Sequence, residues 1–558
     1  MMLIRSEETT GPAVPDRFSL LRASHRIDWR FLLPDVRLGR VAYLGDDDEL
    51  VASLKAGGAS VEILETPELH QVEAPHFDGA VVSASAIGYA GFARALLRPG
   101  GWLYVELPPK RLIRLPGLPR RYRRTLLRLG FHRIETYWHF PSFRFRGAIV
   151  PLFDRNALNS ALARRENTFV ERTKAMLAKL LAKVGLFEPL VRHVSLLAVL
   201  PPAERSNSGL AAFLAAHRDE FGLDRYGYRP PMSHLLITPP GIASTCVVAL
   251  LHPQGQQRPT LVAKLPRLAG DRERLAREAA SLAILHEVWG DAHGSAPEVV
   301  AAGDLADHPF LVETALSGEP LDPARVRRDP RRWIDLVTDW LASLAKATAG
   351  PMEADWYQGL VETPLRQLER LVSDDQMSAL VAETLKGLAA LRTPMTFAVF
   401  EHGDLAHPNV ILTAQDRIGA VDWEKSNPRG LPAHDLIFFL SYVAFAQRRA
   451  LRPQERVVAF HEAFIGRDAW AARVLARFAD RVGLDRSLLT PLVLACWSRH
   501  VAGIASRLTD AEGACAIGDH GRPLPIPEGG LRSALERGWY TALWRHALEH
   551  FDELAWRN

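Results

Sequence analysis

The sequence predicts an α/β part followed by an α+β part, the second divided into a small β-rich lobe and a larger helical lobe. The first 200 or so residues alternate short apolar runs with helical patterns, which is typical of a parallel sheet covered by helices. The later residues open with β-type segments and become mostly helical after Glu319. A polar, turn-rich stretch at 201–209 separates the two patterns, so we place the boundary between the parts there.

The first part is expected to contain a series of short, buried strands. These are predicted at 40–44, 60–64, 79–83, 102–107, 131–138 and 195–200. A helical pattern covers 46–56, and a long helical insertion is expected at 156–185. We therefore predict a first domain over residues 1–203.

The second part is expected to begin with strands and to continue with helices. The strands are predicted at 233–238, 246–251 and 259–265, and a helix at 271–288 that Asp271 can cap. A hairpin is expected near 410–423. These elements predict a second domain over 215–558, with a small lobe at about 215–316 and a large lobe at about 317–558.

Composition favours a globular protein. The 558 residues are 47% apolar and 24% charged, which is close to average globular usage. Three scattered cysteines (Cys246, Cys496, Cys515) are too few for a disulfide framework or a thiolate metal site, which favours a reducing compartment. The longest nearly apolar stretch, Leu436–Ala446, is about half the ~20 residues that cross a bilayer. We therefore expect a soluble, cytoplasmic protein.

The charge distribution says more than the net charge of +4, which is too small to favour nucleic acid. Residues Lys110 to Arg133 hold nine Lys or Arg and no Asp or Glu. Such a run can hold an anionic membrane face or a lipid-linked substrate, which would place the protein at the membrane periphery. The alternative is a solvated helix with an Arg-rich loop.

The segment from Glu401 to Glu424 carries the clearest chemical signal. His402-Gly403-Asp404 is followed, five residues after the aspartate, by Asn409. The hairpin that follows should return Asp422 beside Asn409. Carboxylate and amide oxygens at one point suit Mg²⁺, which keeps phosphates and waters as its other ligands. An aspartate, an asparagine five residues later and a second aspartate also follow the division of labour of phosphoryl transfer.

These residues resemble the aminoglycoside phosphotransferase and choline kinase group of protein-kinase-like enzymes. The resemblance implies a bilobal, protein-kinase-like fold and the use of ATP and Mg²⁺. It also implies that Asp404 is the catalytic base and that Asn409 and Asp422 are the metal ligands. His402 and Asp435 are interpreted as residues that brace the catalytic loop.

Upstream residues fit the same template. Lys264 ends a predicted strand and Glu278 lies in the next helix, a pairing that fixes ATP phosphates. The phosphate-covering loop is expected at Pro239 to Thr245, where Gly241, Ser244 and Thr245 are the candidate contacts. Residues 310–316 resemble the linker between lobes, where Glu313 and Ala315 are the candidates for backbone contact with adenine.

The first part resembles a class I S-adenosylmethionine (SAM)-dependent methyltransferase, which implies a Rossmann-like fold. The matching pieces are 40–44, Glu65, 77–82, 97–102 and 129–131. The loop after the first strand departs from that pattern, because only Gly45 remains and Asp46, Asp47 and Asp48 follow it. Their side chains would occupy cofactor space and repel the SAM carboxylate. We expect a degenerate domain.

The sequence defines the molecule that accepts the phosphate less clearly than it defines the catalytic and metal-binding residues. From Leu436 to Asn558 the chain has 16 Arg and 13 Asp or Glu, with no acidic cluster. This disfavours a polycationic acceptor and leaves sugars and amino alcohols. Two alternatives stay open: a bifunctional kinase and methyltransferase, and a catalytically silent kinase-like scaffold.

Overall fold

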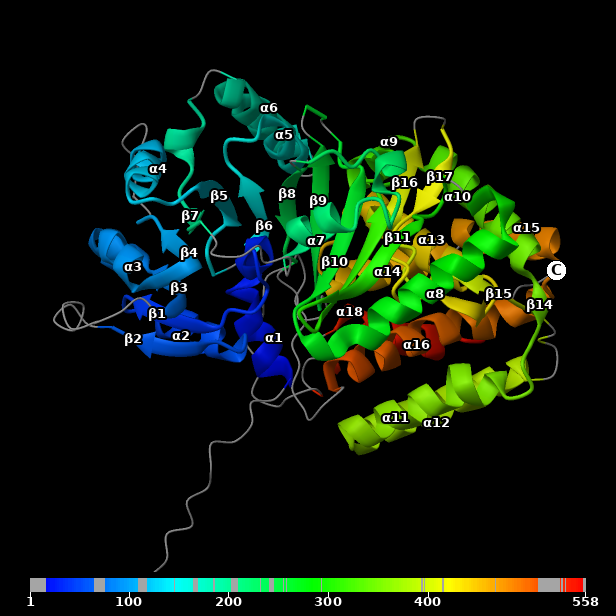
Figure 1. Ribbon diagram of the computed structural model, residues 1–558. Coiled ribbons are helices and arrows are strands. Elements are labelled where there is room, and N and C mark those ends of the chain that lie inside the picture. Colours follow the sequence, from blue (N-terminus) through cyan, green and yellow to red (C-terminus); the bar gives the residue numbers. More distant parts are fainter. Residues whose placement is uncertain are drawn as a thin grey trace, which may run out of the picture.

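A single mixed sheet of twelve strands runs through the molecule (Figure 1). Its strand order is β11-β12-β10-β9-β8-β6-β5-β7-β4-β3-β1-β2. The computed structural model describes residues 17–64, 76–108, 118–144, 146–163, 169–183, 186–201, 209–230, 232–239, 245–253, 255–256, 258–292, 294–392, 395, 397–413, 416–466, 468–509, 532, 535–536 and 538–554. Statements below concern these residues.

The N-terminal half of the sheet is parallel at its core. Its strands are β1 (Arg40–Leu44), β2 (Ser60–Ile63), β3 (Phe77–Val82), β4 (Leu97–Glu106), β5 (Arg133–Pro141) and β7 (Val194–Val199). Strand β1 pairs in parallel with β2 and β3, and β3 with β4. Strand β7 lies antiparallel between β4 and β5. The strands predicted in this region are therefore confirmed, with small shifts at their ends.

Both faces of this half are buried, which explains its continuous apolar strands. Val41 and Tyr43 face one core, together with Leu50 of α2 (Asp48–Ala56). Ala42 and Leu44 face the other core, which is covered by three further helices. These are α3 (Ala90–Leu96), α4 (Leu118–Arg128) and α5 (Arg155–Ala163). Helices α5 and α6 (Phe169–Lys183) lie in the predicted helical insertion.

One of the strands that escaped prediction joins the two halves. Strand β6 (Arg146–Pro151) pairs antiparallel with β5 on one side and with β8 (Met232–Ile237) on the other. It is short, ends at a proline and has no alternating pattern, so its sequence gives little strand signal. The sheet is therefore continuous across the predicted domain boundary, which itself stays a prediction.

The second half of the sheet is antiparallel and forms the small lobe. It comprises β8, β9 (Cys246–Pro253), β10 (Leu261–Pro266), β11 (Val299–Leu305) and β12 (His308–Thr314), with α7 (Leu210–Ala216) preceding β8. Helix α8 (Arg272–Val288) packs against β11 and β12. The helix is where the sequence predicts it, but the Asp271 side chain makes no capping hydrogen bond.

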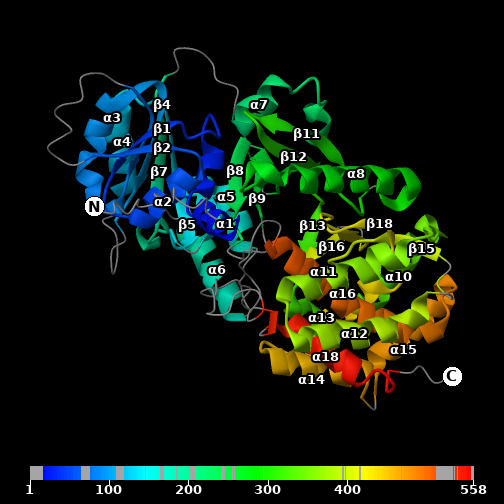
Figure 2. The same cartoon turned by 90° about the horizontal axis from the view of Figure 1, so that it is seen from below.

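The helical lobe lies on one side of this sheet and α8 (Figure 2). Its helices are α9 (Pro323–Arg328), α10 (Pro330–Thr348), α11 (Thr363–Val372), α12 (Asp375–Leu388), α13 (His434–Arg448), α14 (Pro453–Phe464), α15 (Trp470–Val482), α16 (Leu489–Thr509) and α18 (Trp539–Glu549). They share one core with the short strands β13 (Gly318–Pro320), β16 (Val410–Thr413) and β17 (Ile418–Ala420). The predicted hairpin is β16 and β17. Strands β14 (Gly350–Pro351), β15 (Phe397–Glu401) and β18 (Asn427–Gly430) form another small sheet.

A buried ion pair also ties the halves together. Arg267, directly after β10, contacts Asp28 with its Nη2 2.9 Å from Oδ2, and both side chains are buried. Arg30 donates to the carbonyl of Arg267 at 2.6 Å. Asp28 and Arg30 of the N-terminal part therefore hold the end of a small-lobe strand.

Two surface expectations can be compared with the described residues. Of the basic run, 110–117 lie outside the described residues, and the remainder includes α4, whose arginines are exposed. Contact with a membrane stays a prediction. Among the described helices, Arg486–Ser506 is long and apolar enough to span a bilayer. However, 89% of its apolar window is buried in the protein, as in a core helix, so it is weak evidence for a span.

Candidate active site

Asp404 lies in a loop between β15 and the short 3₁₀ turn His407–Asn409. Its Oδ2 atom lies 2.5 Å from Nζ of Lys425, and both side chains are about one-fifth exposed. The Nδ2 atom of Asn409 donates to the backbone carbonyl of Asp404 at 2.9 Å, which turns the amide oxygen of Asn409 away from this bond. The loop therefore presents one carboxylate and one amide oxygen.

The hairpin returns Asp422 to this loop as predicted. The N–H of Val421 donates to the carbonyl of Asn409 at 3.0 Å, so the next residue, Asp422, follows directly beside Asn409. Asp422 has φ +71°, a left-handed conformation that is uncommon for a non-glycine residue. Its side chain is 43% exposed and its Oδ1 lies 3.4 Å from Nζ of Lys264. The strained backbone directs this carboxylate toward the small lobe.

Lys264 is surrounded by carboxylates. It contacts Glu278, and its Nζ lies 3.8 Å from Oε2 of Glu313 in addition to the contact with Asp422. Burial alone would lower the pKa of Lys264, but these three carboxylates raise it well above its ordinary value. Lys264 therefore stays a cation. Glu278 also accepts the N–H of Trp423 at 2.9 Å, which links α8 to the residue after Asp422.

Most of the segment predicted as the linker between lobes, 310–316, lies in strand β12 of the small-lobe sheet. The N–H of Ala315 donates to the carbonyl of Thr260 at 2.9 Å, which extends the pairing of β12 with β10. This amide is already satisfied by the sheet, so it does not fit the predicted contact with adenine. Glu313 directs its side chain to Lys264, a contact that our sequence analysis missed. The sequence signal for this contact is Glu313 itself, an acidic residue within the mostly apolar run FLVET.

The phosphate-covering loop is only partly described. Gly241 and Ser244 lie outside the described residues. Thr245 is 3% exposed, and its hydroxyl lies 3.4 Å from Nη1 of Arg274. The predicted contact of Thr245 with phosphate stays a prediction.

The loop that carries Asp404 is braced from behind. Asp435 accepts the N–H of His402 at 2.7 Å and that of Gly403 at 2.9 Å. His402 accepts the N–H of Asp404 at Nδ1, 3.2 Å away, and its Nε2 lies 3.1 Å from the carbonyl of Val421. These contacts confirm the predicted bracing by His402 and Asp435. Gly403 has φ +78°, and a Cβ there would lie 2.5 Å from the carbonyl oxygen of Lys425.

A second layer supports this brace. Arg499 makes two bonds of 3.0 Å to Glu401 and lies 3.0 Å from Nδ1 of His434. Burial alone would raise the pKa of Glu401, but Arg499 and His434 lower it to about 2. This buried pair fixes the end of β15, where the catalytic loop begins.

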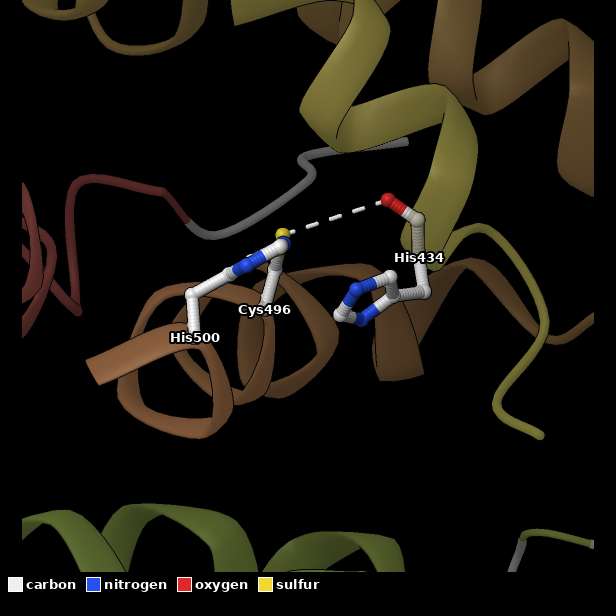
Figure 3. A group of neighbouring side chains, drawn as sticks. All are labelled: His434, Cys496 and His500. Atoms are coloured by element: carbon white, nitrogen blue, oxygen red, sulfur yellow. Dashed lines mark hydrogen bonds between the residues drawn. The ribbon is translucent and has the colours of Figure 1, made fainter. Parts of the chain in front are cut away.

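His434, Cys496 and His500 lie close enough together to suggest a metal site (Figure 3). Nδ1 of His434 is taken by Arg499, whose charge repels a cation at 3.0 Å. Burial also raises the pKa of the Cys496 thiol well above its ordinary value, whereas a metal requires the thiolate. We therefore interpret these side chains as part of the scaffold behind the catalytic loop.

Buried histidines make the stability of the protein pH-dependent. Burial lowers the pKa of each to about 4, so they are neutral when folded but would bind a proton below about pH 6.5 when unfolded. They are His234, His308, His402, His407 and His434. Burial acts in the opposite direction on Asp435, raising its pKa to about 7. Burial also raises the pKa of Glu278 to about 8 and raises that of Glu313, but the five histidines outweigh these three acids, so stability should fall as the pH drops from 6.5 to 4.

We expect this loss to reach several kcal/mol, because each histidine contributes up to about 1.4 kcal/mol per pH unit. Thermal unfolding followed by circular dichroism between pH 8 and pH 4 measures it. The unfolding midpoint should decrease mainly below pH 6.5. A constant midpoint over this range would show that these histidines can be protonated in the folded protein.

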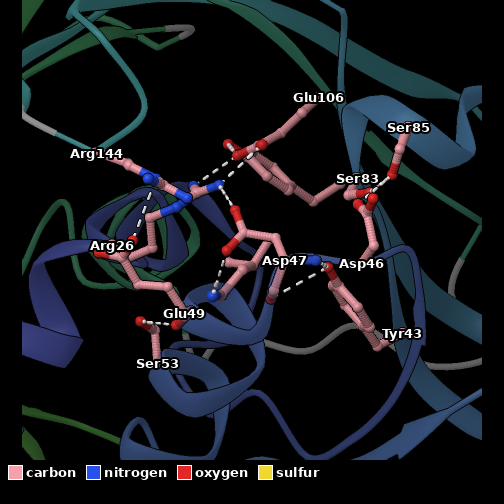
Figure 4. Close-up of polar contacts among 12 residues, drawn as sticks. Arg26, Tyr43, Asp46, Asp47, Glu49, Ser53, Ser83, Ser85, Glu106 and Arg144 are labelled. Carbon is pink, nitrogen blue, oxygen red and sulfur yellow. Dashed lines mark hydrogen bonds and ion pairs between the residues drawn. The ribbon is translucent and has the colours of Figure 1, made fainter.

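A second group of polar residues fills the loop after β1 (Figure 4). The Asp47 side chain caps α2 by accepting the N–H of Leu50 at 3.1 Å, and it lies 3.2 Å from Arg26. Arg26 also contacts Glu106 at 2.6 Å. Asp46 accepts the hydroxyl of Ser85 at 2.5 Å. The side chains that were expected to occupy the loop do so, held by their own hydrogen bonds.

The comparisons with known proteins bear on the second half of the chain. Residues 241–473 match the phosphotransferase enzyme family. This range contains Lys264, Glu278, Asp404, Asn409 and Asp422. The match thus begins after β8 and covers the rest of the small lobe and the first part of the helical lobe. A search of curated proteins finds no similar sequence.

Solved structures with similarity to the chain include three phosphotransferases. Ethanolamine kinase Pv091845 of Plasmodium vivax is 12% identical, with a TM-score of 0.35, and the match covers 56% of this chain and 86% of that one. Choline kinase LicA of Streptococcus pneumoniae is 13% identical, with a TM-score of 0.35 and coverage of 55% and 89%. Aminoglycoside phosphotransferase APH(3'')-Id of Streptomyces rimosus is 17% identical, with a TM-score of 0.32 and coverage of 51% and 98%. The match of residues 241–473 to the phosphotransferase enzyme family, rather than these structural similarities, supports a phosphotransferase.

Lys425 belongs to the candidate active site, although no sequence motif marks it as an active-site residue. Lys425 reaches Asp404 because the chain turns directly after Asp422, where Ser426 donates to the carbonyl of Trp423 at 3.0 Å. A lysine three residues after an aspartate is not a recognisable motif. Only the turn places its ammonium group beside Asp404.

Proposed function

We propose that the protein transfers the γ-phosphoryl group of ATP to a hydroxyl of a small molecule. The observation that carries the proposal is the convergence of Asp404, Asn409, Asp422 and Lys264 in a region that matches the phosphotransferase enzyme family. Acidic and amide oxygens, a buried cation and a partly exposed carboxylate are the groups that phosphoryl transfer requires. The site therefore favours catalysis over simple nucleotide binding.

In the proposed reaction, Asp404 orients the acceptor hydroxyl and takes its proton. The acceptor oxygen forms a bond to the γ-phosphorus, while the bond between that phosphorus and the β–γ bridging oxygen breaks and ADP leaves. Lys264, steadied by Glu278, contacts the nucleotide phosphates. Lys425, 2.5 Å from Asp404, is placed to hold that carboxylate in position.

The residues also fit a magnesium site. Asp422 offers a partly exposed carboxylate, and the amide oxygen of Asn409 is not engaged by the bond that Nδ2 makes to Asp404. Hard oxygen ligands of this kind are those that Mg²⁺ prefers. Bound there, Mg²⁺ would neutralise charge on the nucleotide phosphates. We assign Asn409 and Asp422 as its ligands.

We propose a sugar or an amino alcohol as the acceptor. Tyr442 of α13 lies beside the catalytic loop, 5.5 Å from the ring of His407 between ring centroids. Its hydroxyl is 3.2 Å from that of Tyr540, and Trp539 packs against both rings. Aromatic side chains beside an acceptor site suit the apolar face of a sugar or the ammonium group of an amino alcohol.

A transfer screen tests the proposed function. The full chain is incubated with ATP, Mg²⁺ and panels of sugars and amino alcohols, and products are measured by mass spectrometry. We expect one acceptor class to gain a single phosphate with equal release of ADP. Nucleotide binding without transfer to any acceptor, and without slow ATP hydrolysis, would favour the alternative of a catalytically silent scaffold.

For the N-terminal part, we infer a methyltransferase-like domain that does not bind SAM. The inference is supported by the loop after β1, where Asp46 and Asp47 are held by Ser85 and Arg26. Calorimetry with SAM tests it, and no heat of binding is expected. Measurable binding would instead favour the bifunctional kinase and methyltransferase.

A further inference from the structure

Three histidines lie together at the surface of the helical lobe and have no part in the proposed reaction. His461 is in the last turn of α14, His546 is in the last turn of α18, and His550 directly follows α18. One ring nitrogen from each lies within 4.8 Å of the other two. All three are partly exposed, so an ion in solution can reach them.

The spacing of the ring nitrogens suits a small metal ion. Nδ1 of His461 and Nε2 of His546 are 3.1 Å apart. Two imidazole nitrogens bound to one tetrahedral Zn²⁺ at 2.0–2.1 Å would be separated by about 3.3 Å. The first two ligands are therefore already close to the required separation. The ring centroid of His550 lies 4.3 Å from that of His546 and 5.2 Å from that of His461, so the third imidazole is adjacent to both.

A carboxylate orients the third histidine. Nδ1 of His550 lies 2.7 Å from Oε1 of Glu553. The N–H of Glu553 donates to the carbonyl of His550 at 3.0 Å, which holds this acid beside the ring. A hydrogen bond at Nδ1 leaves Nε2 as the metal-binding nitrogen, the arrangement in which a carboxylate supports a metal-bound histidine.

The surrounding charge also favours a cation. The last turns of α14 and α18 meet at the cluster, and the carbonyl end of each helix carries about half a negative charge. Glu553 adds a full negative charge. At the cluster of His434, Cys496 and His500, by contrast, the guanidinium of Arg499 lies directly on a potential ligand. The two clusters therefore differ in the property that decides cation binding.

We propose that His461, His546 and His550 bind one divalent transition-metal ion of the zinc class, with water in the remaining position. Imidazole ligands suit Zn²⁺, Ni²⁺ or Cu²⁺ and disfavour Mg²⁺ and Ca²⁺, which prefer oxygen. This site is separate from the proposed magnesium site, which is formed by oxygen atoms.

The ion would fasten α18 to α14. At its other end, α18 contributes Tyr540, whose hydroxyl contacts that of Tyr442 on α13 at 3.2 Å. Tyr442 lies against His407 of the catalytic loop. The metal would therefore stabilise the helix that supports the proposed acceptor side of the active site.

Zinc binding by the full chain tests the proposal. The affinity tag is removed, metal is stripped with a chelator, and Zn²⁺ is titrated in competition with a chromophoric zinc indicator in the presence of millimolar Mg²⁺. We expect one equivalent of zinc per chain and an increase in the thermal unfolding midpoint. Removing two ligands in the His546→Ala/His550→Ala variant should weaken binding at least 100-fold, and Glu553→Gln should weaken it about 10–100-fold.

A matched control is His76→Ala, which removes an exposed histidine from the N-terminal part and should leave zinc binding unchanged. The zinc-free unfolding midpoint of each variant shows whether it is folded. Zinc should raise the midpoint of the wild type but not that of the double variant. Equal zinc binding by the wild type and the folded double variant, or no stoichiometric binding by the wild type, would overturn the proposal.

Discussion

Replacing Asp404 by Asn should lower kcat by about two to four orders of magnitude, which is the usual contribution of a positioned general base. The amide cannot accept the proton of the acceptor hydroxyl, and it no longer forms an ion pair with Lys425. Lys264, Glu278 and Asp422 stay in place, because none of their polar contacts described above involves the Asp404 side chain. The affinity for ATP should therefore change little.

Steady-state kinetics with the acceptor identified by the screen, together with nucleotide binding by calorimetry, separate these two effects. Asp416→Asn is the matched control, because Asp416 is an exposed carboxylate in the same hairpin, 3.0 Å from Arg332. Its loss should change kcat less than twofold. If Asp404→Asn retained kcat within tenfold of the wild type, Asp404 would not be the base.

The features that could be predicted from the sequence depend on local spacing. Asn409 and Asp422 flank one hairpin and Asp404 lies in the loop just before it, so the hairpin brings Asp422 back to this loop, as the bond between Val421 and Asn409 shows. Nine of the twelve strands of the large sheet could also be predicted, because buried apolar runs mark them, whereas β6, β11 and β12 were missed. In each case the information lies within about 20 residues of chain.

The missed features depend on distant parts of the chain or on one turn. Lys425 reaches Asp404 only because of the turn at Trp423, and Glu313 reaches Lys264 only through the register of β12 on β10. The joining of the two halves through β6 and β8 depends on two strands that are far apart in sequence. Sequence patterns describe the burial of a strand but not its partner.

The buried ion pair between Asp28 and Arg267 is the second place where a large effect is expected. The Asp28→Ala variant should lose about 3–5 kcal/mol of unfolding free energy, because it leaves a buried guanidinium without its counter-charge. Arg267 is buried and cannot turn to water. Burial has already lowered the pKa of its neighbour Arg30 to about 10, so the loss leaves two guanidinium groups in a poorly solvated environment.

The effect of Asp28→Ala should extend to the proposed nucleotide site. Arg267 follows Lys264 by three residues, its N–H donates to the carbonyl of Thr245 at 2.7 Å, and its Nη2 donates to that of Pro239 at 3.1 Å. It therefore fixes the end of β10 and both ends of the predicted phosphate-covering loop. We expect the KM for ATP to rise in Asp28→Ala, although Asp28 belongs to the N-terminal part of the chain.

Urea unfolding of the full chain measures the stability change, and two further variants show its origin. Asp224→Ala removes the partner of Arg218 in an exposed pair at 2.6 Å and should lower the free energy of unfolding much less than Asp28→Ala does. The double variant Asp28→Leu/Arg267→Met replaces both charges by apolar groups and should recover most of the stability, since the penalty comes from the unpaired charge. A loss below about 1 kcal/mol in Asp28→Ala, or a double variant less stable than that single variant, would show that this pair does not hold the two halves together.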